Sequence, residues 1–137
     1  MNTHNTTAAR GTDKVRLLIA DPLFGCRLSL ELAASDDPHV EVVGACANGI
    51  RGAQVADEVH PAAIIVDVST PTPDGTDVVS LLHAVCPDAR IVVWSDLAQV
   101  DARDAAIRHG AAAVFDKSTR SELVVEAATQ VGVLAGS

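Results

Sequence analysis

The stretch IIVDVSTPTPDG (64–75) places an apolar run, an aspartate and a turn-rich loop in direct succession. Pro61 marks the start of the run AAIIVDV (62–68), which has the length of a strand. A strand that is apolar on both faces is typical of the centre of a parallel sheet covered by helices. An ionised carboxylate would be costly inside such a sheet, so we expect Asp67 at the partly solvated end of its strand.

Segments of strand length and of helical periodicity alternate on both sides of this stretch. Four further apolar runs have strand length, namely VRLLIA (15–20), VEVVGA (40–45), ARIVVWS (89–95) and AAAVF (111–115). Helical segments are predicted at 23–34, 50–60, 76–86, 98–109 and after Thr119. The pattern predicts an α/β fold, a flavodoxin-like (βα)5 open parallel sheet with strand order 2-1-3-4-5 and helices on both faces.

Apolar side chains recur on one face of several helical segments. The stripes are Phe24, Leu28 and Leu32; Val78, Leu82 and Val85; and Leu123, Ala127, Val131 and Leu134. Asn48 is a predicted helix cap, and Thr119 with Glu122 forms a predicted capping box.

Composition sets the remaining limits. The 137 residues suit one domain, predicted at 14–137 after a flexible polar tail at 1–13. A formal charge of −8 argues against nucleic-acid binding by this chain itself. No apolar run has the length of a membrane span and no signal-peptide core precedes the domain, so we expect a cytoplasmic protein without membrane insertion. The three scattered cysteines are expected to be small buried side chains.

Polar residues end four of the predicted strands, at Asp21, Asp67, Ser95 and Asp116–Lys117. Because ligands of open parallel sheets bind at the carboxyl ends of the strands, we expect these side chains to share one site. Two neighbouring carboxylates favour a shared cation, and an oxygen-rich open site suits Mg²⁺. With a lysine charge and a serine hydroxyl beside them, they indicate phosphoryl transfer to a carboxylate.

Each of these residues also has a purely structural interpretation. Asp21 before Pro22 is a possible turn or cap residue, Ser95 a possible helix cap, and Lys117 a possible solvated helix-entry residue. The phosphate-binding patterns GxGxxG and GxxxxGK[ST] and the GxSxG elbow are absent from the sequence. Conventional nucleotide-binding and hydrolase functions therefore lack their usual motifs, and an unrelated flavodoxin-like enzyme is the least favoured hypothesis.

From about residue 14 to 132 the chain resembles the receiver domains of bacterial two-component response regulators, most of all the LuxR/NarL-type class. The resemblance is carried by these segments: VRLLIAD (15–21), VEVVG (40–44), Asn48-Gly49, IIVDVSTPTPDG (64–75), ARIVVWS (89–95) and HGAAAVFDK (109–117). It implies phosphorylation of Asp67 by a sensor histidine kinase with Mg²⁺ and signalling through altered protein–protein contacts with an effector protein. It also implies that the domain is not an enzyme beyond catalysing its own phosphorylation and dephosphorylation.

The resemblance assigns a role to each candidate residue. Asp21, Asp67 and the backbone carbonyl of Ser69 would hold the metal, and Ser95 and Lys117 would contact the phosphoryl group. Val114 occupies the switch position, where the family often carries an aromatic residue.

Pro22 stands where the family carries a second acidic residue, so we expect weakened Mg²⁺ binding. The alternative function is an atypical pseudo-receiver with impaired phosphorylation that acts as a constitutive binding or dimerisation module. A homodimer is expected through the face formed by the helix at 98–109, the strand at 111–115 and the last helix.

Overall fold

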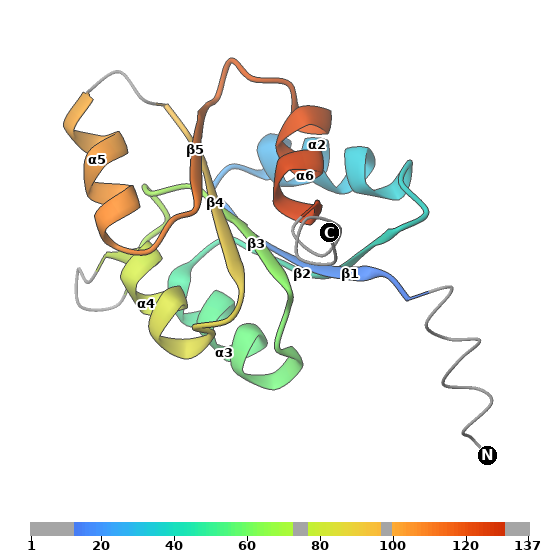
Figure 1. The fold of residues 1–137 in the computed structure, drawn as a ribbon, viewed down its shortest axis with the longest axis horizontal. Coiled ribbons are helices and arrows are strands. Elements are labelled where there is room, and N and C mark those ends of the chain that lie inside the picture. The colour runs from blue at the N-terminus through green and yellow to red at the C-terminus, as the bar shows by residue number, and fades with distance from the viewer. Residues whose placement is uncertain (1–12, 73–76, 97–99, 131–137) are drawn as a thin grey trace.

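The computed structural model describes residues 13–72, 77–96 and 100–130 (Figure 1). The strands form one parallel sheet of order β2-β1-β3-β4-β5, which confirms the predicted topology. They are β1 (Val15–Ala20), β2 (Val40–Cys46), β3 (Ala63–Val66), β4 (Arg90–Ser95) and β5 (Ala113–Asp116). The helices are α2 (Phe24–Ser35), α3 (Gly49–Val59), α4 (Val78–Val85), α5 (Val100–Arg108) and α6 (Ser121–Thr129). None of these helices is long and apolar enough to cross a membrane.

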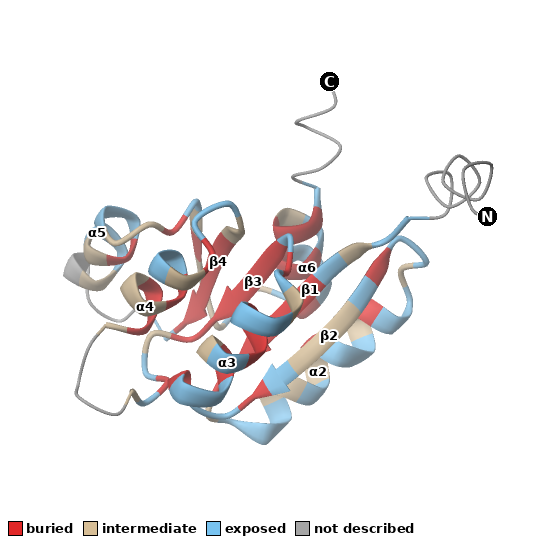
Figure 2. Cartoon of the chain, turned by 90° about the horizontal axis from the view of Figure 1, so that it is seen from below, coloured by how far each residue is buried: buried red, intermediate tan, exposed pale blue. Residues whose placement is uncertain are grey.

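Helices cover both faces of the sheet. Helices α3, α4 and α5 lie on one face, and α2 and α6 lie on the other (Figures 1 and 2). Successive strand side chains alternate between the two layers, so Leu18 packs with α3 and α4 whereas Leu17 and Ile19 pack with α2 and α6. Strand β3 is buried throughout, as its apolar run predicted.

Hydrogen bonds continue past the strand ends and fix the residues that follow them. The Asp21 amide donates to the Cys46 carbonyl at 2.9 Å, and the Asp67 amide donates to the Ala20 carbonyl at 2.9 Å. The Lys117 amide donates to the Ser95 carbonyl at 2.8 Å. Asp21, Asp67 and Lys117 are therefore held at one edge of the sheet.

Helix α2 packs against the sheet with a different side from the one predicted from the spacing of its apolar residues. Leu30 and Ala34 are buried against the sheet, whereas Phe24, Leu28 and Leu32 are exposed by 69%, 42% and 59%. The four-residue spacing of these three side chains correctly places them on one face, but that face points to solvent. Burial instead follows the Leu30–Ala34 side, which fits between α6 and the strands.

Helix α6 corrects two further predictions. Its N-cap is Arg120, without a side-chain cap hydrogen bond, so the Thr119–Glu122 capping box is wrong. The reason is a turn in which the Thr119 amide donates to the Asp116 carbonyl, while the Thr119 carbonyl accepts the Trp94 indole N–H at 3.1 Å. This long-range contact shifts the helix start by one residue, and Leu123 becomes half exposed instead of buried.

Of the three cysteines predicted to be buried, Cys46 and Cys86 are buried and Cys26 is only partly buried. The other local predictions hold or lie outside the described residues. The Asn48 side chain accepts the Arg51 amide and caps α3, as predicted. Val78 and Leu82 are buried on one face of α4. The tail predicted at 1–13 (apart from Asp13), the end of the turn at 73–75, and Val131 and Leu134 of the last stripe lie outside the described residues.

Gly110 has a backbone conformation that other residues adopt only at a cost. Its φ of +123° lies in the region that favours glycine, and an added Cβ would lie 2.8 Å from the His83 ring. We expect Gly110→Ala to lower the free energy of unfolding by about 1–3 kcal/mol. Gly25→Ala is the matched control, because a Cβ there meets nothing within 4 Å and helix propensity improves. Urea unfolding measures both variants, and equal stability of the two would contradict this account.

Candidate functional site

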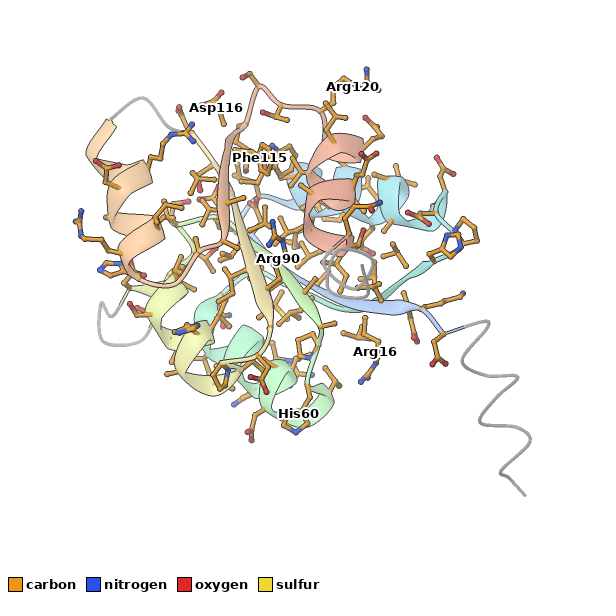
Figure 3. All side chains as sticks on the ribbon, viewed as in Figure 1. Arg16, His60, Arg90, Phe115, Asp116 and Arg120 are labelled. Carbon is orange, nitrogen blue, oxygen red and sulfur yellow. The ribbon has the colours of Figure 1, made fainter. Side chains whose placement is uncertain are left out.

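The predicted site residues gather at the carboxyl edge of the sheet. In Figure 3, Asp116 and Arg120 mark this edge, and Arg16 and His60 lie at the opposite end of the molecule. Asp21 follows β1, Asp67 follows β3, Ser95 ends β4 and Lys117 follows β5. The carboxylates of Asp21 and Asp67 belong to neighbouring strands, as the predicted order requires.

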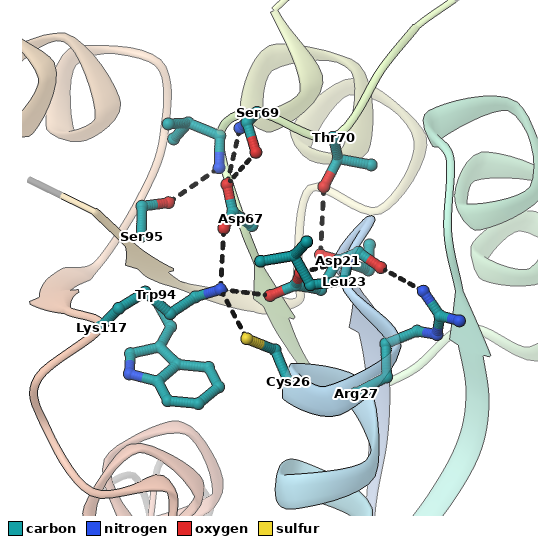
Figure 4. Close-up of polar contacts among 12 residues, drawn as sticks. Asp21, Leu23, Cys26, Arg27, Asp67, Ser69, Thr70, Trp94, Ser95 and Lys117 are labelled. Atoms are coloured by element: carbon teal, nitrogen blue, oxygen red, sulfur yellow. Dashed lines mark hydrogen bonds and ion pairs between the residues drawn. The ribbon is translucent and has the colours of Figure 1, made fainter.

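The ammonium group of Lys117 joins the two carboxylates (Figure 4). Its Nζ lies 2.8 Å from Asp21 Oδ2 and 2.9 Å from Asp67 Oδ2. It also donates to Cys26 Sγ at 3.1 Å and lies 4.9 Å from the centroid of the Trp94 ring. A positive charge between two nearly buried carboxylates neutralises the repulsion that they would otherwise exert on each other.

The remaining oxygens of both carboxylates accept hydrogen bonds. Asp67 Oδ1 accepts the Ser69 amide at 2.7 Å and the Ser69 hydroxyl at 2.6 Å. Asp21 Oδ1 accepts the Leu23 amide at 2.9 Å, so the turn interpretation of Asp21 is correct alongside its place in the site. Asp67 is only 5% exposed. Its carboxylate can stay charged at this degree of burial because both of its oxygens have hydrogen-bond or ion-pair partners.

These contacts change the acidity of two groups. Burial raises the pKa of Asp67, but hydrogen bonds from the Ser69 hydroxyl, the Lys117 ammonium and the Ser69 amide outweigh it and leave this pKa below its ordinary value. Burial lowers the pKa of Lys117, but its contacts with Asp21, Asp67 and Cys26 outweigh burial and raise this pKa above its ordinary value. Asp67 is thus an ionised carboxylate at neutral pH, and Lys117 is a fixed cation.

Ser95 and Val114 occupy different environments. The Ser95 hydroxyl accepts the Val68 amide at 2.9 Å and so contacts the loop that follows Asp67. Val114 is buried in β5 and packs in the α3–α4 layer, while Phe115 packs in the α2–α6 layer, as strand alternation predicted. The Val114 carbonyl accepts a hydrogen bond from the Arg103 guanidinium of α5 at 3.0 Å.

The sequence prediction missed three contributions to the site. Cys26 and Trp94 surround the Lys117 ammonium, and Ser69 contacts Asp67 through its amide and hydroxyl. One signal was available for Cys26, because it lies in the first turn of the helix that leaves the Asp21 edge. No such signal was available for Trp94, because the alternation of side chains along its strand predicts only that Trp94 is buried on the face of the sheet opposite to Ser95.

The site offers oxygen donors of the kind that Mg²⁺ binds, but few of them. Among the described residues no group of three or more His, Cys, Asp and Glu side chains could hold a metal ion. Mg²⁺ nevertheless requires few protein ligands, since it keeps several waters and is bound by one or two carboxylates together with phosphate oxygens. Asp21 and Asp67 meet this requirement at its minimum, and Pro22 adds no side-chain oxygen.

Comparison with known proteins places this arrangement in a family. Residues 17–129 match the family model of the response regulator receiver domain. The chain belongs to this family. Receiver domains are the signal-receiving phospho-acceptor parts of two-component response regulators, and this chain is accordingly a receiver domain with the flavodoxin-like fold.

Individual receiver proteins resemble the chain at modest identity. The chemotaxis protein CheY of Listeria monocytogenes is 28% identical over 113 residues, which cover 82% of this chain and 94% of that protein. The transcriptional regulatory protein YhcZ of Bacillus subtilis is 28% identical over 112 residues, which cover 82% of this chain and 52% of YhcZ. The chain therefore spans about half the length of YhcZ and nearly all of this CheY.

The fold similarity is closer than the sequence similarity. The signal receiver domain of the response regulator NarL from Mycobacterium tuberculosis superposes with a TM-score of 0.78 at 22% identity, covering 91% of this chain and 99% of that domain. This likeness shows that the chain has the receiver fold.

Proposed function

We propose that Asp67 is the phospho-acceptor of this receiver domain and takes a phosphoryl group from a sensor histidine kinase in the presence of Mg²⁺. The supporting observation is the ion pair between Asp67 and Lys117 at the carboxyl edge of the sheet. It keeps a nucleophilic carboxylate ionised and places a cation where the charge of a phosphoryl group would develop.

The transfer forms one bond and breaks one. A carboxylate oxygen of Asp67 attacks phosphorus, and the bond between phosphorus and the imidazole nitrogen of the donor histidine breaks, so the imidazole leaves with the electron pair. Lys117 turns its ammonium to the arriving phosphoryl oxygens, and the Ser95 hydroxyl donates a hydrogen bond to one of them. Both groups already lie within reach of the Asp67 loop.

We assign the metal ligands to Asp21, Asp67 and the backbone carbonyl of Ser69. When bound, the cation neutralises charge on the phosphoryl oxygens. Lys117 contacts both carboxylates, so its ammonium would compete with a cation for Asp21 and Asp67. Competition with an internal cation and the absence of a carboxylate at Pro22 both favour weak metal binding.

The remaining partners follow from the receiver function. We assign output to the face formed by α5, β5 and α6, through an effector protein or a homodimer, and expect a cytoplasmic location. Val114 cannot undergo the rotation of an aromatic side chain, so the change at Asp67 would reach this face through the Ser95 contact and the Arg103–Val114 hydrogen bond.

Phosphorylation by a small-molecule donor tests the acceptor assignment. With acetyl phosphate and Mg²⁺, the intact mass of the wild-type chain is expected to rise by one phosphoryl group, and Asp67→Asn is expected to prevent the adduct because the amide lacks the nucleophilic oxygen pair. Asp116→Asn is the matched control at the same sheet edge and should still be labelled. A wild-type chain that stays unmodified, or an adduct that persists in Asp67→Asn, would overturn the proposal.

A further inference from the structure

Helix α2 presents an apolar stripe to solvent over its whole length. Phe24, Leu28 and Leu32 are exposed by 69%, 42% and 59%, and Leu23, which precedes the helix, by 57%. Figure 2 shows the outward side of α2 largely exposed beside strand β2, at an edge of the sheet. Scattered exposed leucines are ordinary, but a contiguous stripe four residues apart on one helix marks an interaction surface.

Two charged residues follow one margin of this stripe. Arg27 lies near the start of α2, where its guanidinium donates to the Asp21 carbonyl at 2.8 Å and lies 5.7 Å from the centroid of the Phe24 ring. Glu31 lies one turn later. Among the described residues, Glu31 takes part in none of the ion pairs. Asp36 and Asp37 follow the helix directly, so the start of α2 is basic and its end is acidic.

This order of charges is the reverse of what the helix dipole favours. The positive N-terminal end of a helix favours acidic residues and the negative C-terminal end favours basic ones. Helix α2 has no acidic residue in its first turn and no basic residue in its last turn. A second helix that runs antiparallel would correct both ends, since its acidic end would lie at the basic start of the first.

We propose that α2 is a self-association surface, on which a second copy of this chain packs its own α2 in the antiparallel direction. With the two-fold axis at Leu28, the Leu28 side chains of both copies meet and each Phe24 faces the Leu32 of the other copy. Arg27 then lies beside Glu31 of the second copy. In this arrangement the basic start of α2 in one copy lies beside the acidic end of α2 in the other copy. A two-fold symmetric interface requires such a self-complementary surface.

The expected dimer is weak. One helix of twelve residues presents much less than the roughly 800 Å² per partner of a standard interface, and each chain carries a net charge of −8. The face is also distinct from the α5–β5–α6 face assigned to output, so dimerisation through α2 does not depend on phosphorylation of Asp67.

Analytical ultracentrifugation tests the interface directly. Up to about 1 mM, where weak interfaces associate, the mass of the unphosphorylated wild type is expected to rise from 14.1 kDa toward twice that value. Leu28→Ser is expected to weaken association about tenfold or more, because the residue lies on the two-fold axis. Ile50→Ser is the matched control, an exposed isoleucine on α3 at the other face of the sheet, and should associate like the wild type.

Charge reversal tests the antiparallel arrangement and keeps every apolar side chain of the stripe, and Arg27→Glu also removes the Arg27 contacts with the Asp21 carbonyl and the Phe24 ring. Glu31→Arg places like charges together and is expected to weaken association, whereas adding Arg27→Glu in the same chain restores opposite pairs and should recover it. A wild type that stays monomeric overturns the proposal. Equal loss in Ile50→Ser, or no recovery in the double reversal, would also overturn it.

Discussion

Replacing Pro22 with aspartate is expected to tighten Mg²⁺ binding by about one to two orders of magnitude, since a charged ligand contributes roughly 1.5–3 kcal/mol. Pro22 follows Asp21 at the edge of the sheet and supplies neither a side-chain oxygen nor an amide proton. The resemblance to receiver domains implies a second acidic residue at this position. The substitution therefore adds a carboxylate to the metal site that we propose at Asp21 and Asp67.

Isothermal titration calorimetry with MgCl₂ measures this change. Pro22→Ala is the matched control, because it removes the ring and restores the amide proton without adding a carboxylate. The gain in Mg²⁺ affinity should also shrink when Pro22→Asp is combined with Asp67→Asn, since we propose that the carboxylates at positions 22 and 67 bind the same cation. Equal affinities in Pro22→Asp and Pro22→Ala would show that position 22 does not reach the metal.

Replacing Lys117 with methionine is expected to lower the free energy of unfolding by about 3 kcal/mol in metal-free buffer at pH 7, because removal of one partner leaves buried charges uncompensated. The Asp21 and Asp67 side chains are 2% and 7% exposed, and both lose the same cation. Added Mg²⁺ should recover part of the loss, since a divalent cation can replace the ammonium. This recovery separates the loss of charge from a loss of packing.

Between pH 7 and pH 5, the stability of this variant should depend on pH, whereas the Asp67–Lys117 pair of the wild type contributes no such dependence in this range. In the wild type the pKa of Asp67 is lowered on folding, so its contribution is present above the unfolded pKa of about 4 and is lost as the pH falls through the folded value. The pKa of Lys117 is raised on folding, so its contribution is complete below its unfolded pKa of about 10.4 and is lost as the pH rises through the folded value. Without the lysine, repulsion between two carboxylates raises a carboxyl pKa, and stability should increase from pH 7 to pH 5.

Urea unfolding at these two pH values checks both statements. The chain has only one other lysine, Lys14, which is exposed, and Lys14→Met is the matched control. A Lys117→Met variant as stable as Lys14→Met at pH 7 would show that the ammonium does not hold the two carboxylates. A flat pH profile in Lys117→Met would contradict the repulsion between them.

The sheet and its functional edge were predictable because the apolar runs encode them directly. Each run is too short for a buried helix and four of the five end at a polar residue, so the strand order alone brings Asp21, Asp67 and Lys117 to one edge. What the order cannot specify is which polar groups touch. The Lys117 ammonium contacts Asp21, Asp67 and Cys26 at once because a long flexible side chain takes whatever acceptors the surrounding elements supply.

The wrong predictions for helices α2 and α6 have related causes. Helix α2 has apolar residues on both sides, and periodicity does not say whether the side of Leu30 or that of Leu28 meets the sheet. The start of α6 depends on a hydrogen bond from Trp94 to the Thr119 carbonyl, which links residues 25 positions apart. Local patterns contain no information about such contacts.

The position of Trp94 beneath the Lys117 ammonium gives the domain an optical reporter of its own. Trp94 is the single tryptophan of the chain, which has no tyrosine, so ultraviolet emission arises almost wholly from this ring. The emission of an indole depends on the charge near its face, and Lys117 lies 4.9 Å from the ring centroid. Any event that draws the ammonium toward a new anion therefore changes the fluorescence, and occupancy of the site can be followed in unlabelled protein in real time.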